Sequence, residues 1–169
     1  AGSPPVVITQ HIPAAFSSSF AQRLNNNSEM SVCEAEQDML VKVGCAYLAP
    51  GDQHLRVVRA RGGYVCKLDD SDPVNRHRPS VEVLFDSVLE AAGTKAMGVI
   101  LTGMGADGAE SLLRMREAGC ATVAQDEATS VVWGMPGAAV AVEAAVKVLP
   151  LDKISKFILY QAVADRSIK

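Results

Sequence analysis

The segment Val99–Gly108, which reads Val-Ile-Leu-Thr-Gly-Met-Gly-Ala-Asp-Gly, constrains the fold more than any other part of the chain. Its apolar start is typical of a buried strand, its glycines predict a tight turn, and a helical pattern begins at Ala109. In an open α/β sheet, ligands and chemistry gather at the carboxyl ends of the strands. Asp107, the carboxylate in this turn, is therefore a candidate site residue.

A second segment has the same form. Val6–Thr9 is apolar and predicts a short strand, His11 lies just beyond it, and Pro13 suits the first turn of a helix expected over Ala14–Leu24. The chain thus places one imidazole and one carboxylate, each just after a strand.

Size and composition favour one globular domain over residues 1–169, with residues 1–5 as a linker or lead-in. Hydrophobic residues make up 49% of the chain and aromatic residues only 5%, so we expect a core of Val, Leu, Ile and Ala. The net charge of −3 provides no general attraction to nucleic acid or to an anionic membrane. No apolar run approaches the length of a membrane span, so no membrane insertion is expected.

The four cysteines lie far apart in the sequence and show no Cys-x-x-Cys spacing; they are Cys33, Cys45, Cys66 and Cys120. This spacing favours buried, reduced thiols over a zinc site or a disulfide framework, and no metal site is predicted.

The rest of the chain alternates between expected strands and helices around one hairpin. Strands are predicted over Gly44–Pro50, Met97–Thr102 and Cys120–Gln125, and a hairpin pairs His54–Arg59 with Tyr64–Leu68. Helices are predicted between Ser80 and Gly93, over Ala109–Ala118, from about Ala138 to Ala145, and from Asp152 to about Val163. The pattern predicts an α/β fold, with a doubly wound, mostly parallel sheet flanked by helices and an inserted antiparallel hairpin.

Asp107 and His11 each allow two interpretations. Asp107 precedes a helix and Glu110 follows three residues later, which resembles a capping box. Alternatively, the carboxylate of Asp107 orients the imidazole of His11, whose second nitrogen then takes a proton from a nucleophile. By itself, His11 is also consistent with a hydrogen-bonded residue at the end of a strand.

The other two histidines suggest different roles. His77 lies between Arg76 and Arg78, and these positive charges discourage a metal ion. The three residues are candidates to face a substrate carboxylate or another anion, or they form a solvated loop before a helix. His54, in a predicted hairpin strand, is interpreted as structural.

Gly103, Gly105 and Gly108 also satisfy a G-x-G-x-x-G pattern between a strand and a helix, and Asp126 lies where a ribose-binding acid belongs. A dinucleotide-binding domain is therefore an alternative hypothesis. Against it, Asp107 would place a negative charge in the loop meant to hold a pyrophosphate. The pattern also starts too late in the chain for a second mononucleotide-binding half.

Several segments together resemble the catalytic domain of the chemotaxis protein-glutamate methylesterase family. They are Ile8–Pro13 (Ile-Thr-Gln-His-Ile-Pro), Tyr47–Asp52 (Tyr-Leu-Ala-Pro-Gly-Asp), Asn75–Leu84 (Asn-Arg-His-Arg-Pro-Ser-Val-Glu-Val-Leu), Gly98–Gly108 and Gly134-Met135-Pro136. They occur in order between about Val6 and Val148.

The resemblance implies a cytoplasmic serine hydrolase without a cofactor. Such an enzyme removes methyl groups from glutamates on chemoreceptor helices and deamidates certain glutamines there. His11 and Asp107 match the family's triad histidine and aspartate, and the backbone at Met104 matches a turn that helps to bind the oxyanion.

The chain departs from the family at the nucleophile. The family's serine lies in a Gly-x-Ser-Thr-Gly-Gly turn, one strand and one helix before the histidine, and nothing in this sequence matches that turn. The family's receiver domain is also unmatched. We therefore expect the chain as given to be inactive.

Three explanations for the unmatched serine stay open. The chain is a truncated piece of the enzyme, a catalytically dead receptor-binding module, or a domain that receives its serine from another chain. Truncation is favoured, because the N-terminal strand and helix of the family fold are also unmatched. An unpaired sheet edge would then favour a dimer.

Overall fold

The computed structural model describes residues 3–164. The chain divides into two compact units, Ala1–Ala91 and Ala92–Lys169, here called the first and second units. The prediction of a single domain over residues 1–169 stays a prediction.

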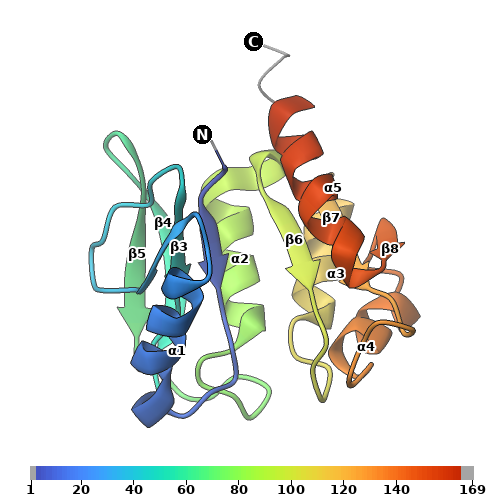
Figure 1. The fold of residues 1–169 in the computed structure, drawn as a ribbon, viewed down its shortest axis with the longest axis horizontal. Coiled ribbons are helices and arrows are strands. Elements are labelled where there is room, and N and C mark those ends of the chain that lie inside the picture. Colours follow the sequence, from blue (N-terminus) through green and yellow to red (C-terminus); the bar gives the residue numbers. More distant parts are fainter. Residues whose placement is uncertain (1–2, 165–169) are drawn as a thin grey trace. The chain divides into compact units, whose positions relative to one another are not determined.

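The first unit begins with a parallel sheet. Its strands are β1 (Val6–Ile8), β2 (Ser31–Glu34) and β3 (Cys45–Leu48), in the order β1-β3-β2. Ile8 and Glu34 both lie opposite Leu48, so all three strands end at the same edge. Helix α1 (Ala14–Asn26) connects β1 to β2 and packs against β2 (Figure 1). The residues that follow β1, including His11, therefore leave the sheet at its carboxyl edge.

An antiparallel hairpin completes the first unit together with a helix. Strands β4 (His54–Ala60) and β5 (Gly63–Asp69) pair from His54 opposite Asp69 to Ala60 opposite Gly63, which leaves a two-residue turn. Gly62, the second residue of that turn, has φ +93°, a left-handed conformation that glycine adopts readily. Helix α2 (Val81–Ala92) packs on the hairpin through a buried cluster that includes Leu55, Val57, Cys66 and Leu84.

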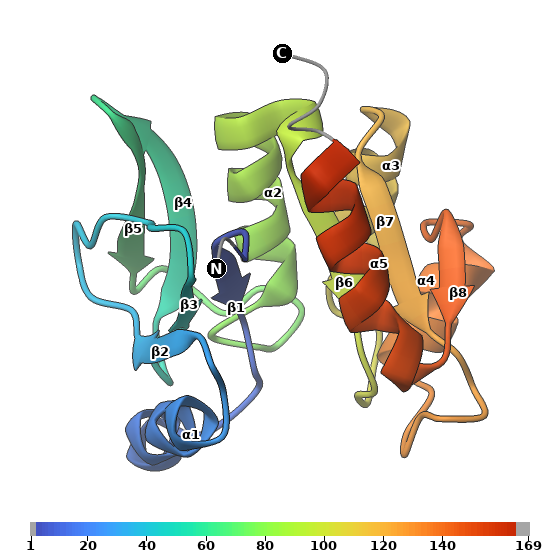
Figure 2. The same cartoon turned by 45° about the horizontal axis from the view of Figure 1, so that its top comes forward.

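The second unit contains another parallel sheet. A short 3-10 helix, η1 (Gly93–Lys95), precedes the strands β6 (Met97–Ile100), β7 (Ala121–Gln125) and β8 (Lys147–Leu149), which lie in that order. The helices are α3 (Ala109–Glu117), α4 (Met135–Ala141) and α5 (Leu151–Ala164). In Figures 1 and 2, α3 and α5 lie on opposite faces of this sheet.

Close helix–sheet packing in the second unit depends on Gly98 in β6. A Cβ atom at Gly98 would lie 2.4 Å from Leu112 Cδ1 of α3, so a larger residue there would force the Leu112 side chain to move. The turn that carries Asp107 connects these two packed elements.

The predicted fold class is confirmed: parallel sheets are flanked by helices, and an antiparallel hairpin is inserted. Two details of the prediction were wrong. Helix α4 begins at Met135, not near Ala138, because Pro136 lies in its first turn, where a missing N–H costs nothing. That helix also ends at Ala141, and Glu143, with φ +57°, directs the chain into β8 instead of extending the helix to Ala145.

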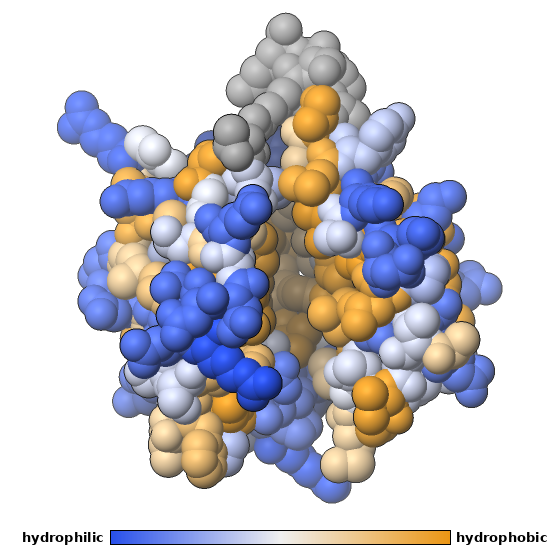
Figure 3. Space-filling model, in the orientation of Figure 1, coloured by the Kyte–Doolittle hydropathy of each residue, from blue (hydrophilic) through white to orange (hydrophobic). Residues whose placement is uncertain are grey.

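The visible surface is mostly polar, with apolar residues in separate groups (Figure 3). Such scattered apolar groups are normal for a folded protein. Among the helices within residues 3–164, none has the length and apolar character needed to span a bilayer.

Candidate active site

His11 lies three residues beyond the end of β1, and Pro13 is the N-cap of α1. Its imidazole stacks on that of His77, with ring centroids 3.8 Å apart and ring planes 8° from parallel. Both rings line an open pocket of about 240 Å³ whose other lining residues are Ile12, Pro13, Arg76, Arg78 and Pro79. The first unit therefore brings His11 together with Arg76, His77 and Arg78, the three residues predicted to face a substrate.

The residues around His77 form a tight turn. Val74 and His77 exchange backbone hydrogen bonds of 3.0 and 2.9 Å. The two residues between them, Asn75 and Arg76, have φ values of +53° and +68°, as a type I′ turn requires. The backbone of His77 thus closes a hydrogen-bonded turn whose two central residues are Asn75 and Arg76.

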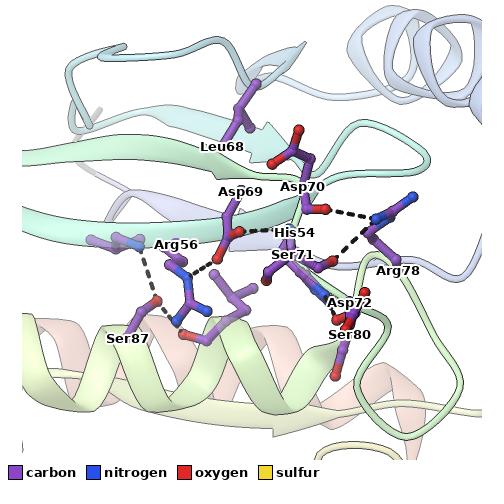
Figure 4. Close-up of polar contacts among 12 residues, drawn as sticks. His54, Arg56, Leu68, Asp69, Asp70, Ser71, Asp72, Arg78, Ser80 and Ser87 are labelled. Atoms are coloured by element: carbon purple, nitrogen blue, oxygen red, sulfur yellow. Dashed lines mark hydrogen bonds and ion pairs between the residues drawn. The ribbon is translucent and has the colours of Figure 1, made fainter.

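Arg78 is engaged by other groups of the protein. Its Nη2 lies 2.9 Å from Asp52 Oδ1. Its Nη1 donates to the backbone oxygens of Asp70 and Ser71 at 2.7 and 3.1 Å (Figure 4). These contacts give Arg78 an anchoring role in the loop between β5 and α2. Sequence reasoning missed its partner Asp52, although Asp52 lies in the recognisable turn Pro50-Gly51-Asp52.

His54 is fully buried and has a structural role, as predicted. Its Nδ1 accepts a hydrogen bond from the Ser80 backbone N–H at 3.1 Å, so Nε2 carries the proton and donates to the Asp72 carbonyl at 3.1 Å (Figure 4). One imidazole therefore ties both ends of the loop that carries His77 to strand β4.

Asp107 lies in the second unit, in the turn between β6 and α3, and its side chain is buried, with 2% of the residue exposed. The N-cap of α3 is Gly108, at φ +86°, one residue later than the capping-box interpretation requires. That interpretation was wrong, because the glycine itself adopts the left-handed conformation that starts the helix.

Met104 lies at the exposed tip of the same turn, and the segment between β7 and the start of α4 holds the backbone just before it. Val132 N–H donates to Thr102 Oγ1, and Gly103 N–H donates to Val132 O. The N–H groups of Gly134 and Met135 both donate to Gly103 O, at 3.1 and 2.8 Å. The backbone around Met104 is therefore fixed before any ligand binds.

Gly134 and Gln125 are supports that sequence reasoning missed. A Cβ at Gly134 would lie 2.7 Å from Gly103 O and 3.2 Å from Met104 Cα, so the two loops meet only because this residue is glycine. The buried amide of Gln125 accepts from Thr102 N–H at 2.8 Å and donates to Thr129 O at 2.7 Å. A glutamine at the end of a buried strand was the available signal for such a role.

Asp126 is also engaged, and this weakens the dinucleotide hypothesis. Its Oδ1 accepts hydrogen bonds from the Thr129 backbone N–H at 3.0 Å and from the Thr129 hydroxyl at 2.6 Å. The carboxylate expected to bind a ribose therefore closes a local turn.

The cysteines and the possible metal ligands of residues 3–164 form no second site. All four cysteines are free thiols, and burial raises the pKa of Cys66 to about 11, so this thiol stays protonated at neutral pH. Within residues 3–164, no group of three or more His, Cys, Asp or Glu side chains is arranged to hold a metal ion.

Comparison with known proteins identifies the family. The family model described as CheB methylesterase matches residues 1–158. This chain belongs to the CheB methylesterase family. The turns of Met104 and Asp107 and the segment of His11 all lie within the matched CheB region.

Individual CheB relatives agree with this assignment. A Saccharophagus degradans protein named protein-glutamate methylesterase/protein-glutamine glutaminase 2 is 63% identical over 161 residues, which cover 95% of this chain and 46% of the relative. A Hahella chejuensis protein, protein-glutamate methylesterase/protein-glutamine glutaminase 1, is 60% identical over 152 residues, which cover 90% of this chain and 42% of the relative. The chain thus spans less than half the length of these two relatives.

A solved CheB structure matches most of this chain. The crystal structure of the Thermotoga maritima CheB methylesterase catalytic domain has a TM-score of 0.90 and 39% sequence identity, covering 93% of this chain and 83% of that chain. This likeness confirms the fold class and the expected family resemblance.

Proposed function

We propose that this chain is the catalytic domain of a cytoplasmic protein-glutamate methylesterase that also deamidates glutamines, and that it acts on chemoreceptors in chemotaxis. The observation that carries the proposal is the CheB family match over residues 1–158, together with the names of relatives up to 63% identical. The partners proposed are the methylated helices of a chemoreceptor and a regulatory receiver domain in the full-length protein.

In this proposal, His11 and Asp107 act as the base and the orienting carboxylate of a Ser-His-Asp triad. A serine hydroxyl attacks the methyl ester carbonyl, and His11 takes the hydroxyl proton. Asp107 accepts the hydrogen bond from the other imidazole nitrogen and stabilises the imidazolium. His11 then gives the proton to the departing methanol, and water hydrolyses the acyl-enzyme.

The backbone at Met104 would stabilise the oxyanion of the tetrahedral intermediate. Its fixed loop supports this role, because a preorganised donor needs no reorganisation when charge develops. The hydrogen bonds from Val132, Gly134 and Met135 to the turn supply that rigidity. Arg76 and His77 would lie near the carboxylate-bearing substrate helix.

The serine of the triad has no match in the 169 residues, so we propose that the chain alone is inactive. Removal of the nucleophile from a comparable triad enzyme lowers kcat about 10⁶-fold. A decisive experiment therefore supplies a serine segment. A chimera carries this chain's residues in place of the 161 aligned residues of the Saccharophagus degradans relative, whose remaining length is retained.

The chimera should release methanol from methylated chemoreceptor, whereas this chain alone should not. His11→Ala and Asp107→Ala in the chimera should each lower the rate by at least about 10⁴-fold, because each removes a member of the triad. Asp152→Ala, an exposed carboxylate at the start of α5, is the control and should keep the parent rate. Activity that survives both triad substitutions would show that the assignment is wrong.

The unmatched serine also favours a second candidate, an inactive module that binds the receptor and competes with the active enzyme. This candidate predicts that the chain alone binds methylated receptor, and that the chimera does too, but that neither releases methanol. Isothermal titration against the receptor's cytoplasmic helices, run beside the methanol assay, distinguishes the two functions.

A further inference from the structure

We infer that His77 is a positioning residue, which fixes the ring plane of His11 by stacking on it. The inference rests on the proposed function, because it concerns the base of the proposed triad. The two rings are 3.8 Å apart and 8° from parallel, so they are in face-to-face contact over much of their area. Rotation of the His11 ring about its Cβ–Cγ bond would break this contact or collide with His77.

The stack can restrain His11 only if His77 is itself held, and its turn supplies the first restraint. Val74 and His77 close the turn with two backbone hydrogen bonds. Asn75 and Arg76 both lie in the left-handed region that this turn type requires. Asparagine tolerates such a conformation better than most residues, which suits the sequence to this turn.

Side chains on both sides of the turn supply the second restraint. After the turn, Arg78 binds the Asp52 carboxylate and two carbonyl oxygens from residues 70 and 71. Before it, the carbonyl of Asp72 accepts a hydrogen bond from Nε2 of buried His54. Figure 4 shows these groups converging on the segment between β5 and α2. The loop is therefore attached to the protein on both sides of His77.

The turn Pro50-Gly51-Asp52 also holds the segment of His11. A Cβ at Gly51 would lie 2.4 Å from Ala14 Cα and 2.8 Å from the Pro13 carbonyl carbon, so this turn packs directly on the backbone just after His11. Gly51 N–H donates to the buried Ser17 hydroxyl at 3.1 Å, and that hydroxyl donates to Glu34.

One turn thus anchors both segments whose imidazoles stack. Asp52 fixes the position of Arg78 and hence of His77, and Gly51 fixes the start of α1 and hence of His11. Proton transfer requires the imidazole nitrogen to lie within hydrogen-bond reach of the serine hydroxyl, in the correct direction. A side chain that holds the plane of His11 therefore raises kcat without contacting the substrate.

Nuclear magnetic resonance on this chain tests the stacking directly, because the protein has only three histidines, His11, His54 and His77. The ring current of His77 should shift the His11 ring C–H signals upfield. His77→Ala should move those signals downfield, and His77→Phe, which keeps an aromatic ring, should leave them upfield. Urea midpoints of both variants show whether each is folded.

Kinetics in the chimera test the consequence. His77→Ala should lower kcat for methanol release about tenfold or more, because small misplacements of a catalytic group cost up to about 10²-fold. Its KM for the receptor should change less than twofold, and His77→Phe should restore most of kcat. If His77 bound the substrate, His77→Ala would raise KM instead. If His77 acted by gaining or losing a proton, His77→Phe would not restore kcat.

The outcomes separate this inference from the proposed function. Unmoved His11 signals in His77→Ala, or an unchanged kcat in that variant, overturn the inference while leaving the triad intact. Equal losses in the alanine and phenylalanine variants overturn it as well. Retained activity in His11→Ala instead overturns the proposed function.

Discussion

The carboxylate of Asp69, the last residue of β5, holds the start of the loop that leads to His77. It accepts hydrogen bonds from the Ser71 backbone N–H at 2.8 Å and from Arg56 Nε at 2.6 Å. The Ser71 backbone N–H, and then Arg56, lower the pKa of Asp69 to about 2, from an ordinary value of 3.8. Both contacts favour the ionised form of Asp69, so the folded chain holds the proton of this carboxyl group more weakly than the unfolded chain does.

The pKa of Asp69 predicts a stability contribution with a definite pH dependence. Because the folded pKa lies below the unfolded one, the contribution is complete above about pH 4 and is lost as the pH falls toward about 2. Asp69→Asn should therefore lower the urea midpoint at pH 7, and the difference from the parent should shrink near pH 2. Asp72→Asn, at an exposed carboxylate in the same loop, is the control and should lower the urea midpoint at pH 7 less than Asp69→Asn does. A constant difference at all pH values would contradict the argument.

Among the elements, the contact between α2 and β4 includes a buried hydrogen bond to one hydroxyl, beside the apolar cluster that the two elements share. Ser87 Oγ accepts the buried Val57 N–H at 2.9 Å and donates to Leu84 O at 2.8 Å. This bond ties one position of α2 to one position of β4. Since α2 follows the loop of His77, the same bond also fixes where that loop ends.

Ser87→Ala should lower the free energy of unfolding by about 1–2 kcal/mol. The unsatisfied Val57 N–H costs about 1–3 kcal/mol, and the higher helix propensity of alanine returns about 0.5 kcal/mol. Urea unfolding followed by circular dichroism measures the difference. Ser19→Ala on the exposed face of α1 should change stability by less than about 0.5 kcal/mol. Equal effects of the two substitutions would show that the Ser87 contact carries no special weight.

On the scale of the whole molecule, local patterns predicted most of the elements, and the site residues taken from those patterns stay a prediction. Apolar runs, turn glycines and helix periodicity indicate β1, β6, the hairpin and the helices because these signals act within a few residues. His11 and Asp107 were found by the same logic, as polar residues just after strands. Strand β8 was not predicted, because it has only three residues and two of them are exposed.

The contacts that organise the site could not be predicted in this way. The stack of His11 on His77, the Arg78–Asp52 pair and the fit of Gly134 onto the Met104 turn each join distant segments. Their formation depends on where whole elements pack, and no periodicity encodes that. A resemblance to a known family supplied the roles of His11 and Asp107, while the structure supplied their supports.

The edge strands of the two parallel sheets lead to a last prediction, on self-association. Within their own sheets, β1 and β2 each pair on one side only, as do β6 and β8. A strand with an unpaired side presents N–H and C=O groups that another chain can bind. We propose that the chain alone associates through such an edge, and that the chimera, which carries the relative's preceding segment, does so less. Sedimentation velocity over a range of concentrations checks this. If the chain and the chimera both remain strictly monomeric, pairing through a strand edge does not occur. If both associate equally, the relative's preceding segment does not cover the strand edge through which the chains associate.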